Sequence, residues 1–89
     1  MDQEQFEDAK QRYEKLLPTI GNLKDKIARR DLVKFSRICV SNLEKISREE
    51  VRCRQLKRVT ESYKKLLQDY TESVDVLEKY TVLAVLSDG

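Results

Sequence analysis

Residues 56–80 read LKRVTESYKKLLQDYTESVDVLEKY, and this stretch decides the fold class. Apolar side chains recur in it at intervals of three and four residues, which is the spacing of one face of an α-helix. Extended to residue 84, the stripe follows a heptad. Its a-like positions are Leu56, Tyr63, Tyr70, Leu77 and Ala84, and its d-like positions are Val59, Leu66, Ser73 and Tyr80. The spacing predicts a long helix over about residues 48–86.

The composition of the whole chain also favours helices. Of its 89 residues 38% are charged, whereas only two are glycine and one is proline. Many charged residues and few helix breakers are typical of long helices and coiled coils, and a chain of this length suits a single domain. We therefore expect residues 1–89 to form one all-α coiled-coil domain, with helices folded into a hairpin.

The strongest helix-breaking signal is LLPTIGN, residues 16–22. Pro18 lacks a backbone N–H and clashes with the preceding turn, and Gly21 weakens the helix further. The sequence thus predicts a short N-terminal helix over about residues 2–17 and a second helix starting near Asn22. In the alternative, Pro18 only kinks a longer helix, because the apolar register continues beyond it.

A second signal lies in the middle of the chain. In ISREEV, Ser47 and Glu50 have the spacing of a capping box at a helix start. This predicts a turn at residues 44–48, between a helix over about residues 22–45 and the long helix. Residues 22–88 contain no glycine or proline, so one continuous helix from residue 22 onward is the alternative.

The C-terminal run YTVLAVL, residues 80–86, is apolar on more than one side of a helix. Beside the heptad stripe it carries Val82, Leu83, Val85 and Leu86. A helix that is apolar all round must be buried all round. We therefore expect residues 80–89 to dock on a partner, either among its helices or as an added β-strand. A frayed, locally sticky end is the alternative.

The tyrosines of the heptad stripe bear on the kind of assembly. Parallel two-stranded coiled coils prefer Ile or Val at a and Leu at d, and a buried tyrosine hydroxyl needs a hydrogen-bond partner. The stripe therefore favours an antiparallel or heteromeric assembly with other helical proteins. The predicted seam residues are Leu56, Val59, Tyr63, Leu66, Tyr70, Leu77 and Tyr80. Alternatively, the stripe packs on the first two helices of the same chain.

Catalysis and metal binding find little support in the sequence. The chain has no histidine, and general acid–base catalysis at neutral pH uses histidine most often. Cys39 and Cys53 lack the close spacing of zinc ligands, so both are interpreted as small buried apolar residues. We expect no enzyme activity, catalytic residue, cofactor or metal.

A basic segment, residues 48–58, supplies candidate phosphate contacts. They are Arg48, Arg52, Arg54, Lys57 and Arg58. Such clusters bind nucleic-acid backbones, but no aromatic residues alternate with these bases to stack on nucleotides. Solvated flanks of a coiled coil are the favoured interpretation, and nucleic-acid binding is the alternative.

Taken together, these features predict a non-enzymatic coiled-coil subunit that acts as a scaffold in a multi-protein assembly. The sequence shows neither a signal peptide nor an apolar run long enough to span a membrane. We therefore expect an intracellular protein of the cytoplasm or nucleus, most simply in a hetero-oligomer. A monomeric three-helix adaptor or chaperone is the remaining alternative.

Overall fold

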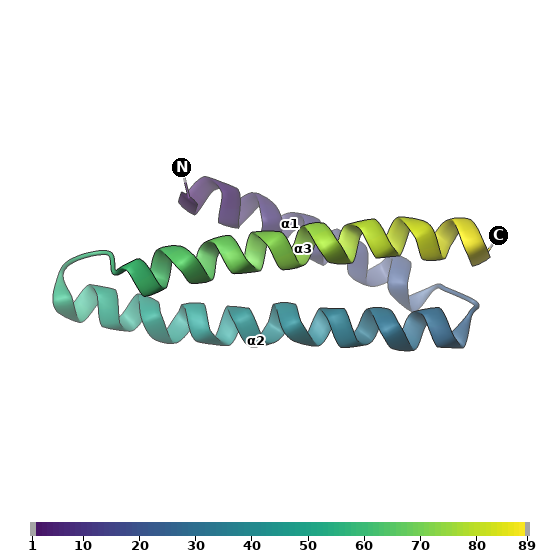
Figure 1. The fold of residues 1–89 in the computed structure, drawn as a ribbon, viewed down its shortest axis with the longest axis horizontal. Helices are drawn as coiled ribbons and strands as arrows, with labels where there is room; N and C mark the ends of the chain where they lie inside the picture. Colours follow the sequence, from purple (N-terminus) through teal and green to yellow (C-terminus); the bar gives the residue numbers. More distant parts are fainter. Residues whose placement is uncertain (1, 89) are drawn as a thin grey trace.

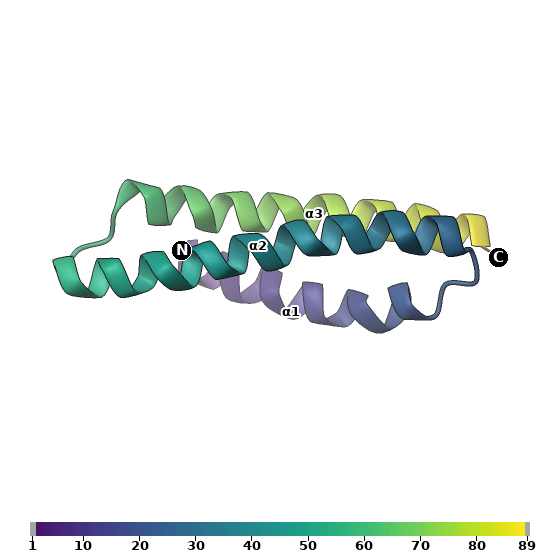
Figure 2. The same ribbon diagram turned by 90° about the horizontal axis from the view of Figure 1, so that it is seen from below.

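The computed structural model describes residues 2–88, and it confirms the all-α fold class. Its helices span Asp2–Gly21 (α1), Lys26–Leu56 (α2) and Glu61–Asp88 (α3), and no strand occurs within the described range. Each helix is antiparallel to the one before it, and together they form a rod with extents of 50 × 21 × 16 Å (Figure 1). The two connections lie at opposite ends of this rod (Figure 2).

The last helix is the centre of the packing. α3 contacts both α1 and α2 extensively, whereas α1 and α2 contact each other little. One apolar core is shared by the three helices. Its buried members are Phe6, Ala9, Tyr13, Ile20, Leu23, Leu32, Cys39, Ile46, Tyr63, Leu67, Tyr70, Val74 and Leu77.

The first helix does not end before Pro18 as predicted, because α1 continues through the proline to Gly21. The apolar side chains on either side of its end, Ile20 and Leu23, are both buried in the core. The backbone N–H of Asn22 donates to the carbonyl of Pro18 at 3.1 Å and closes the last turn. Tertiary burial thus holds a turn that local propensity disfavours.

Two carboxylates hold the connection between α1 and α2. Asp25 caps α2, because its Oδ1 accepts the backbone N–H groups of Ile27 at 2.8 Å and Ala28 at 3.2 Å. From the end of α3, Asp88 accepts the backbone N–H groups of Lys24 at 2.8 Å and Asp25 at 2.6 Å. α2 therefore begins later than predicted, and the end of α3 is tied to the start of α2.

The predicted turn at residues 44–48 is wrong, since α2 is helical throughout this region. Leu32, Cys39, Ile46 and Cys53 recur every seven residues along α2 and pack in or against the core. Ile46, in the middle of the predicted turn, is 1% exposed. Ser47 is an exposed residue inside the helix and not its start. The alternative of a continuous helix is correct as far as Leu56, where α2 ends.

The chain instead reverses at residues 57–60. Lys57 adopts the left-handed conformation, with φ 56° and ψ 36°. The backbone N–H of Lys57 donates to the carbonyl of Arg54 at 3.3 Å, and that of Arg58 donates to the carbonyl of Cys53 at 3.1 Å. This pair of bonds is a Schellman motif, in which glycine normally occupies the left-handed position.

Replacing Lys57 by glycine should therefore stabilise the protein by about 0.5 kcal/mol. Glycine removes the steric penalty that a side chain meets at positive φ, and the extra entropy of the unfolded chain offsets part of the gain. Urea denaturation measures the change. Arg58→Gly is the control, because Lys57 is the only non-glycine residue with positive φ in the described chain. A lower urea midpoint for Lys57→Gly than for the wild type would contradict this account.

Polar contacts from α2 fix the start of α3. Thr60 caps the helix by accepting the backbone N–H of Tyr63 at 3.1 Å, and its hydroxyl donates to Glu49 at 2.8 Å. The hydroxyl of Tyr63 lies 3.2 Å from an oxygen of Glu50. The last helix therefore begins at Glu61 and not near residue 48. Glu49 and Glu50, at the end of the predicted capping box, thus hold this turn from the side of α2.

Two rows of α3 residues are buried, and one of the two differs from the predicted stripe. The a-like residues Tyr63, Tyr70 and Leu77 are buried as expected for a packed seam. The second buried row consists of Leu67, Val74 and Thr81 instead of the predicted d-like residues. α3 faces two helices at once, and a wider apolar stripe is needed for two neighbours than for one.

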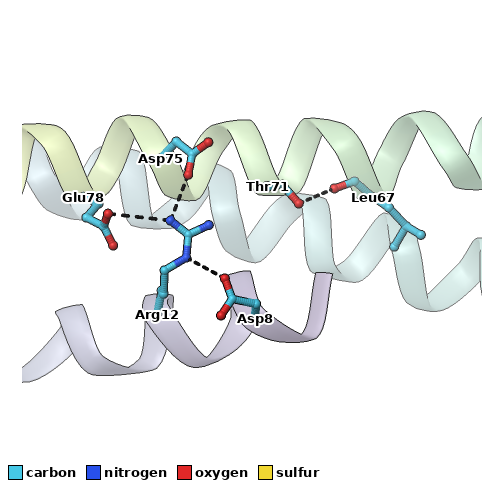
Figure 3. A network of polar contacts seen from close by, with 6 residues as sticks. All are labelled: Asp8, Arg12, Leu67, Thr71, Asp75 and Glu78. Carbon is cyan, nitrogen blue, oxygen red and sulfur yellow. Dashed lines mark hydrogen bonds and ion pairs between the residues drawn. The ribbon is translucent and has the colours of Figure 1, made fainter. Parts of the chain in front are cut away.

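An ionic network joins α1 to α3 at the surface (Figure 3). The guanidinium of Arg12 lies 2.9 Å from Asp75 and 3.6 Å from Glu78 on α3, and 3.2 Å from Asp8 on its own helix. The hydrogen bond to Asp75 is the main cause that raises the pKa of Arg12. A network of this kind fixes the relative position of α1 and α3 more than it adds to stability.

Candidate partner-binding surface

The predicted seam residues fall into a buried and an exposed group. Tyr63, Tyr70 and Leu77 lie in the core, and Leu66 is partly buried against it. Leu56, Val59 and Tyr80 are exposed. The alternative interpretation, packing on the chain's own helices, therefore holds for the buried residues, and only the two ends of the stripe reach solvent.

An open apolar groove runs between α2 and α3, in the half of the rod that contains the α1–α2 connection. Its volume is about 620 Å³. We call it the α2–α3 groove, and its main apolar residues are Ile27, Leu32, Phe35, Ile38, Tyr80 and Leu83. A second hollow of about 430 Å³ shares Phe35 and Ile38 and continues the groove to Asn42 and Val76.

An aromatic pair forms a fixed contact in the groove. The rings of Phe35 and Tyr80 are stacked, with centroids 5.1 Å apart and an interplanar angle of 10°. Farther along, the side-chain amide of Asn42 donates to the Ser73 hydroxyl at 3.0 Å. These contacts link α2 directly to α3. The groove is therefore bounded by direct side-chain contacts between the two helices.

The charged groups of the groove are mostly acidic. Asp31 and Lys34 line the first hollow, and Asp69 and Glu72 line the second. Asp25 also borders the groove, but its carboxylate caps α2. A surface with three carboxylates and one ammonium group is electrostatically complementary to lysine or arginine side chains on a partner.

The predicted docking residues at the C-terminus are all exposed. Val82, Leu83, Val85 and Leu86 have exposed fractions between 43% and 74%. The run is helical as far as Asp88, neither frayed nor extended as a strand. Of these four residues only Leu83 lines the groove. The other three lie outside the groove, and their exposed fractions are 53% for Val82, 43% for Val85 and 74% for Leu86.

Two groove residues were missing from the sequence prediction. Ile38 of α2 and Val76 of α3 line the groove, but neither lies in the apolar registers that the sequence indicated. The sequence did contain a sign of this surface, because residues 26–40 have more apolar side chains than one helix face requires. Such an excess indicates a second contact face.

The candidate reactive groups are engaged in packing or capping. Cys39 is buried, and Cys53 is partly buried against the core, as predicted. Burial raises the pKa of the Cys39 thiol to about 11. Within residues 2–88 no group of three metal-binding side chains has a suitable arrangement. Glu49 and Glu50 accept the hydroxyl hydrogen bonds of the α2–α3 turn.

Stability should fall at alkaline pH. Burial, followed by the charge of Glu50, raises the pKa of Tyr63 from 10.0 to about 12. Burial alone raises the pKa of the Cys39 thiol from 9.0 to about 11. The unfolded chain then loses protons at lower pH than the folded chain, so unfolding becomes easier as pH rises. We expect a constant melting temperature below about pH 9 and a decline between about pH 9 and 12.

Circular dichroism melting curves measured across this range test the prediction. Burial also raises the pKa of Tyr13 and Tyr70. Tyr63→Phe removes one of these four groups, so its alkaline decline should be shallower than that of the wild type. A melting temperature that stays constant up to pH 12 would contradict the assignment.

The candidate phosphate-binding residues gather near the α2–α3 turn. All five are exposed, and Arg54, Lys57 and Arg58 line one hollow together with Val59 and Glu50. Arg48 lies farther along α2, at 3.9 Å from Glu44. The basic segment, residues 48–58, thus lies toward the end of the rod opposite the α1–α2 connection.

No family model, curated protein or solved structure matches the chain. The function must therefore be inferred from the surface itself. Among residues 2–88, no helix is long and apolar enough to cross a membrane.

Proposed function

We propose that this protein is a non-enzymatic helical module that binds a helical partner through the α2–α3 groove. The observation that carries the proposal is the exposure of large apolar groove residues beside a complete core. Ile27 is 73% exposed, and Ile38 and Leu83 are each 50% exposed. Contiguous apolar surface on a folded protein commonly marks an interaction site.

The shape of the groove favours an amphipathic helix as ligand. A fourth helix lying between α2 and α3 would present residues at i, i+3, i+4 and i+7 to the groove. Each large apolar side chain that is fully removed from water contributes about 1.5–3 kcal/mol. The stacked Phe35–Tyr80 pair supplies a rigid aromatic contact of the kind that often dominates binding energy. The carboxylates of Asp31, Asp69 and Glu72 favour a partner helix with a basic flank.

In this proposal the protein is a scaffold subunit of a multi-protein assembly. The buried tyrosines pack against helices of the same chain. The partner therefore binds to a bundle that is already folded, and its binding is not needed to form the core. The compartment proposed for this assembly is the cytoplasm or nucleus, where free cysteines such as Cys39 and Cys53 are common.

A self-contained adaptor is the second candidate function. The observation that favours it is the shared core of all three helices, which includes the central tyrosines. An adaptor of this kind would fold alone and bind its ligands transiently. The two functions differ in the lifetime of the complex and not in the binding surface.

A matched set of variants tests the groove. Ile38→Asp and Leu83→Asp each place a charge in the groove, whereas Val51→Asp places one at an equally exposed apolar residue of α2 outside it. Substitution is preferable to truncation, because the C-terminal segment contains buried Thr81 and the Asp88 contacts to the α1–α2 connection. Unchanged helicity and urea midpoint establish that each variant is folded.

Proteins recovered from cells with the wild-type chain are then purified and titrated against each variant by calorimetry. We expect the groove variants to weaken binding at least tenfold, which corresponds to about 1.4 kcal/mol, and Val51→Asp to leave it unchanged. Equal weakening by Val51→Asp would argue against the groove. Light scattering on the isolated chain checks for self-association, and a dimer sensitive to Leu83→Asp would mean that a second copy fills the groove.

A further inference from the structure

Charge is concentrated at the end of the rod that contains the α2–α3 turn. Residues 51–65 carry six basic side chains and one acid, which gives them a net charge of +5. The whole chain carries +2, so the remaining residues sum to −3. The basic side chains are Arg52, Arg54, Lys57, Arg58, Lys64 and Lys65. We call this end of the rod, residues 51–65, the basic tip.

The basic tip also exposes aliphatic side chains. Val51 is 50% exposed, Leu56 is 45% exposed and Val59 is 57% exposed. Val59 lines a hollow together with Arg54 and Lys57. Val59 therefore shares a surface with three of the bases, Arg54, Lys57 and Arg58, and Leu56 directly precedes Lys57 in the chain.

Each acid in or beside the basic tip is engaged by a neighbouring side chain. Glu61 lies 3.7 Å from Lys64, and Glu49 accepts from Thr60. Glu50 lies 3.2 Å from the hydroxyl of Tyr63 and lines the same hollow as Arg54 and Lys57. Glu7 of α1 is close enough to Tyr63 to raise its pKa. The N-terminal end of α1 is set back from the turn (Figure 1). The projecting end of the α2–α3 hairpin is thus left predominantly basic.

We propose that the basic tip docks on membrane surfaces that contain anionic phospholipids. Lysine and arginine side chains are attracted to the negative headgroups, and each one close to such a surface strengthens binding about fivefold. Leu56 and Val59 enter the boundary between headgroups and acyl chains, as apolar residues of peripheral proteins do. Docking by this end requires no membrane-spanning segment.

The combination of side chains favours a membrane over a nucleic acid. Single-stranded nucleic acids are bound by aromatic side chains that stack on bases, whereas the exposed apolar residues of the basic tip are aliphatic. A phosphate backbone offers no apolar layer to receive Leu56 and Val59. A lipid surface takes up both the charges and the aliphatic groups.

This inference is independent of the proposed partner-binding function. The α2–α3 groove and the basic tip lie toward opposite ends of a rod with a long dimension of 50 Å. A rod that touches a membrane with one end leaves the groove near the other end open to a partner. The protein would then hold its partner at a fixed distance from a lipid surface.

Vesicle flotation tests the proposal with the full chain. The two vesicle types are pure phosphatidylcholine and phosphatidylcholine with about 30% phosphatidylserine. We expect binding to the anionic vesicles and at least tenfold weaker binding to the neutral ones. Raising the salt from about 0.1 to 0.5 M should release the protein, because it screens the headgroup charge. Equal binding to both vesicle types would overturn the proposal.

Two double variants separate the contribution of the basic side chains to vesicle binding from that of the aliphatic side chains. Lys57→Gln with Arg58→Gln should weaken vesicle binding about 25-fold, since each base contributes about fivefold. Leu56→Ser with Val59→Ser should weaken it about tenfold while leaving the salt dependence unchanged, because the bases remain. Val33→Ser, an exposed aliphatic residue in the half of α2 away from the basic tip and outside the groove, is the matched control and should bind as the wild type does. The positions are exposed, and an unchanged urea midpoint verifies folding.

A short DNA duplex at the same salt concentration provides the competing outcome. We expect it to bind more weakly than anionic vesicles. Tighter binding to the duplex, together with no effect of the Leu56 and Val59 substitutions on vesicle binding, would overturn the membrane proposal and assign the basic tip to nucleic acid.

Discussion

Replacing Arg48 by proline should destabilise the protein by about 3 kcal/mol or more. Arg48 lies inside the continuous helix α2, where proline removes a backbone hydrogen bond and its ring clashes with the carbonyl four residues earlier. If Ser47 capped a helix instead, residue 48 would be the first helical position, where proline is favoured. The substitution therefore distinguishes a continuous α2 from a turn at residues 44–48.

Two control variants make the comparison specific. Arg48→Ala removes the side chain and its distant contact to Glu44, and should change stability by less than about 0.5 kcal/mol. Glu61→Pro places proline at the first residue of α3, directly after the cap Thr60, and should change stability by less than about 1 kcal/mol. Urea denaturation monitored by circular dichroism gives all three values. A larger loss for Glu61→Pro than for Arg48→Pro would move the turn back toward Ser47.

Replacing Leu77 by alanine should cost about 2–5 kcal/mol in the isolated chain. Leu77 is 0% exposed and packs in the core that α3 shares with α1 and α2. Its removal leaves a cavity that the surrounding helices fill only in part. Because no partner is present in this experiment, the loss reports packing within the chain.

Leu86→Ala is the matched control, since it deletes the same atoms from a residue that is 74% exposed. We expect it to change stability by less than about 0.5 kcal/mol. Differential scanning calorimetry of both variants measures the difference. Similar small effects at Leu77 and Leu86 would mean that the heptad stripe is not packed in the isolated chain and depends on another protein for its burial.

The fold class could be predicted from the sequence because helix periodicity is a local property. The spacing of Tyr63, Tyr70 and Leu77 indicated one apolar row of α3, which was predicted to pack on a partner and is buried within the chain's own core. The turn could not be predicted in the same way. Ser47 and Glu50 have the spacing of a cap, but the burial of Ile46 outweighs that signal, and burial depends on residues far away in the sequence. Nothing in the sequence indicated that α2 ends at Lys57, because lysine seldom adopts the positive φ that this helix end requires.

The candidate site was predictable only in part. Leu83 was anticipated from the apolar run at the C-terminus, and Tyr80 from the heptad stripe. Phe35 and Ile38 became groove residues because α2 extends past the predicted turn and runs antiparallel to α3 for its whole length. A surface made of two helices depends on their register, which neither helix specifies alone.

The central position of α3 has a consequence for the order of events during synthesis. α1 and α2 leave the ribosome first, yet they contact each other little and share a core only through α3. Until the third helix emerges, residues such as Leu32 and Ile46 have no surface to cover them, and such exposed apolar groups promote aggregation. The nascent chain is therefore expected to need chaperone protection until α3 has left the ribosome, and to collapse into its bundle only then.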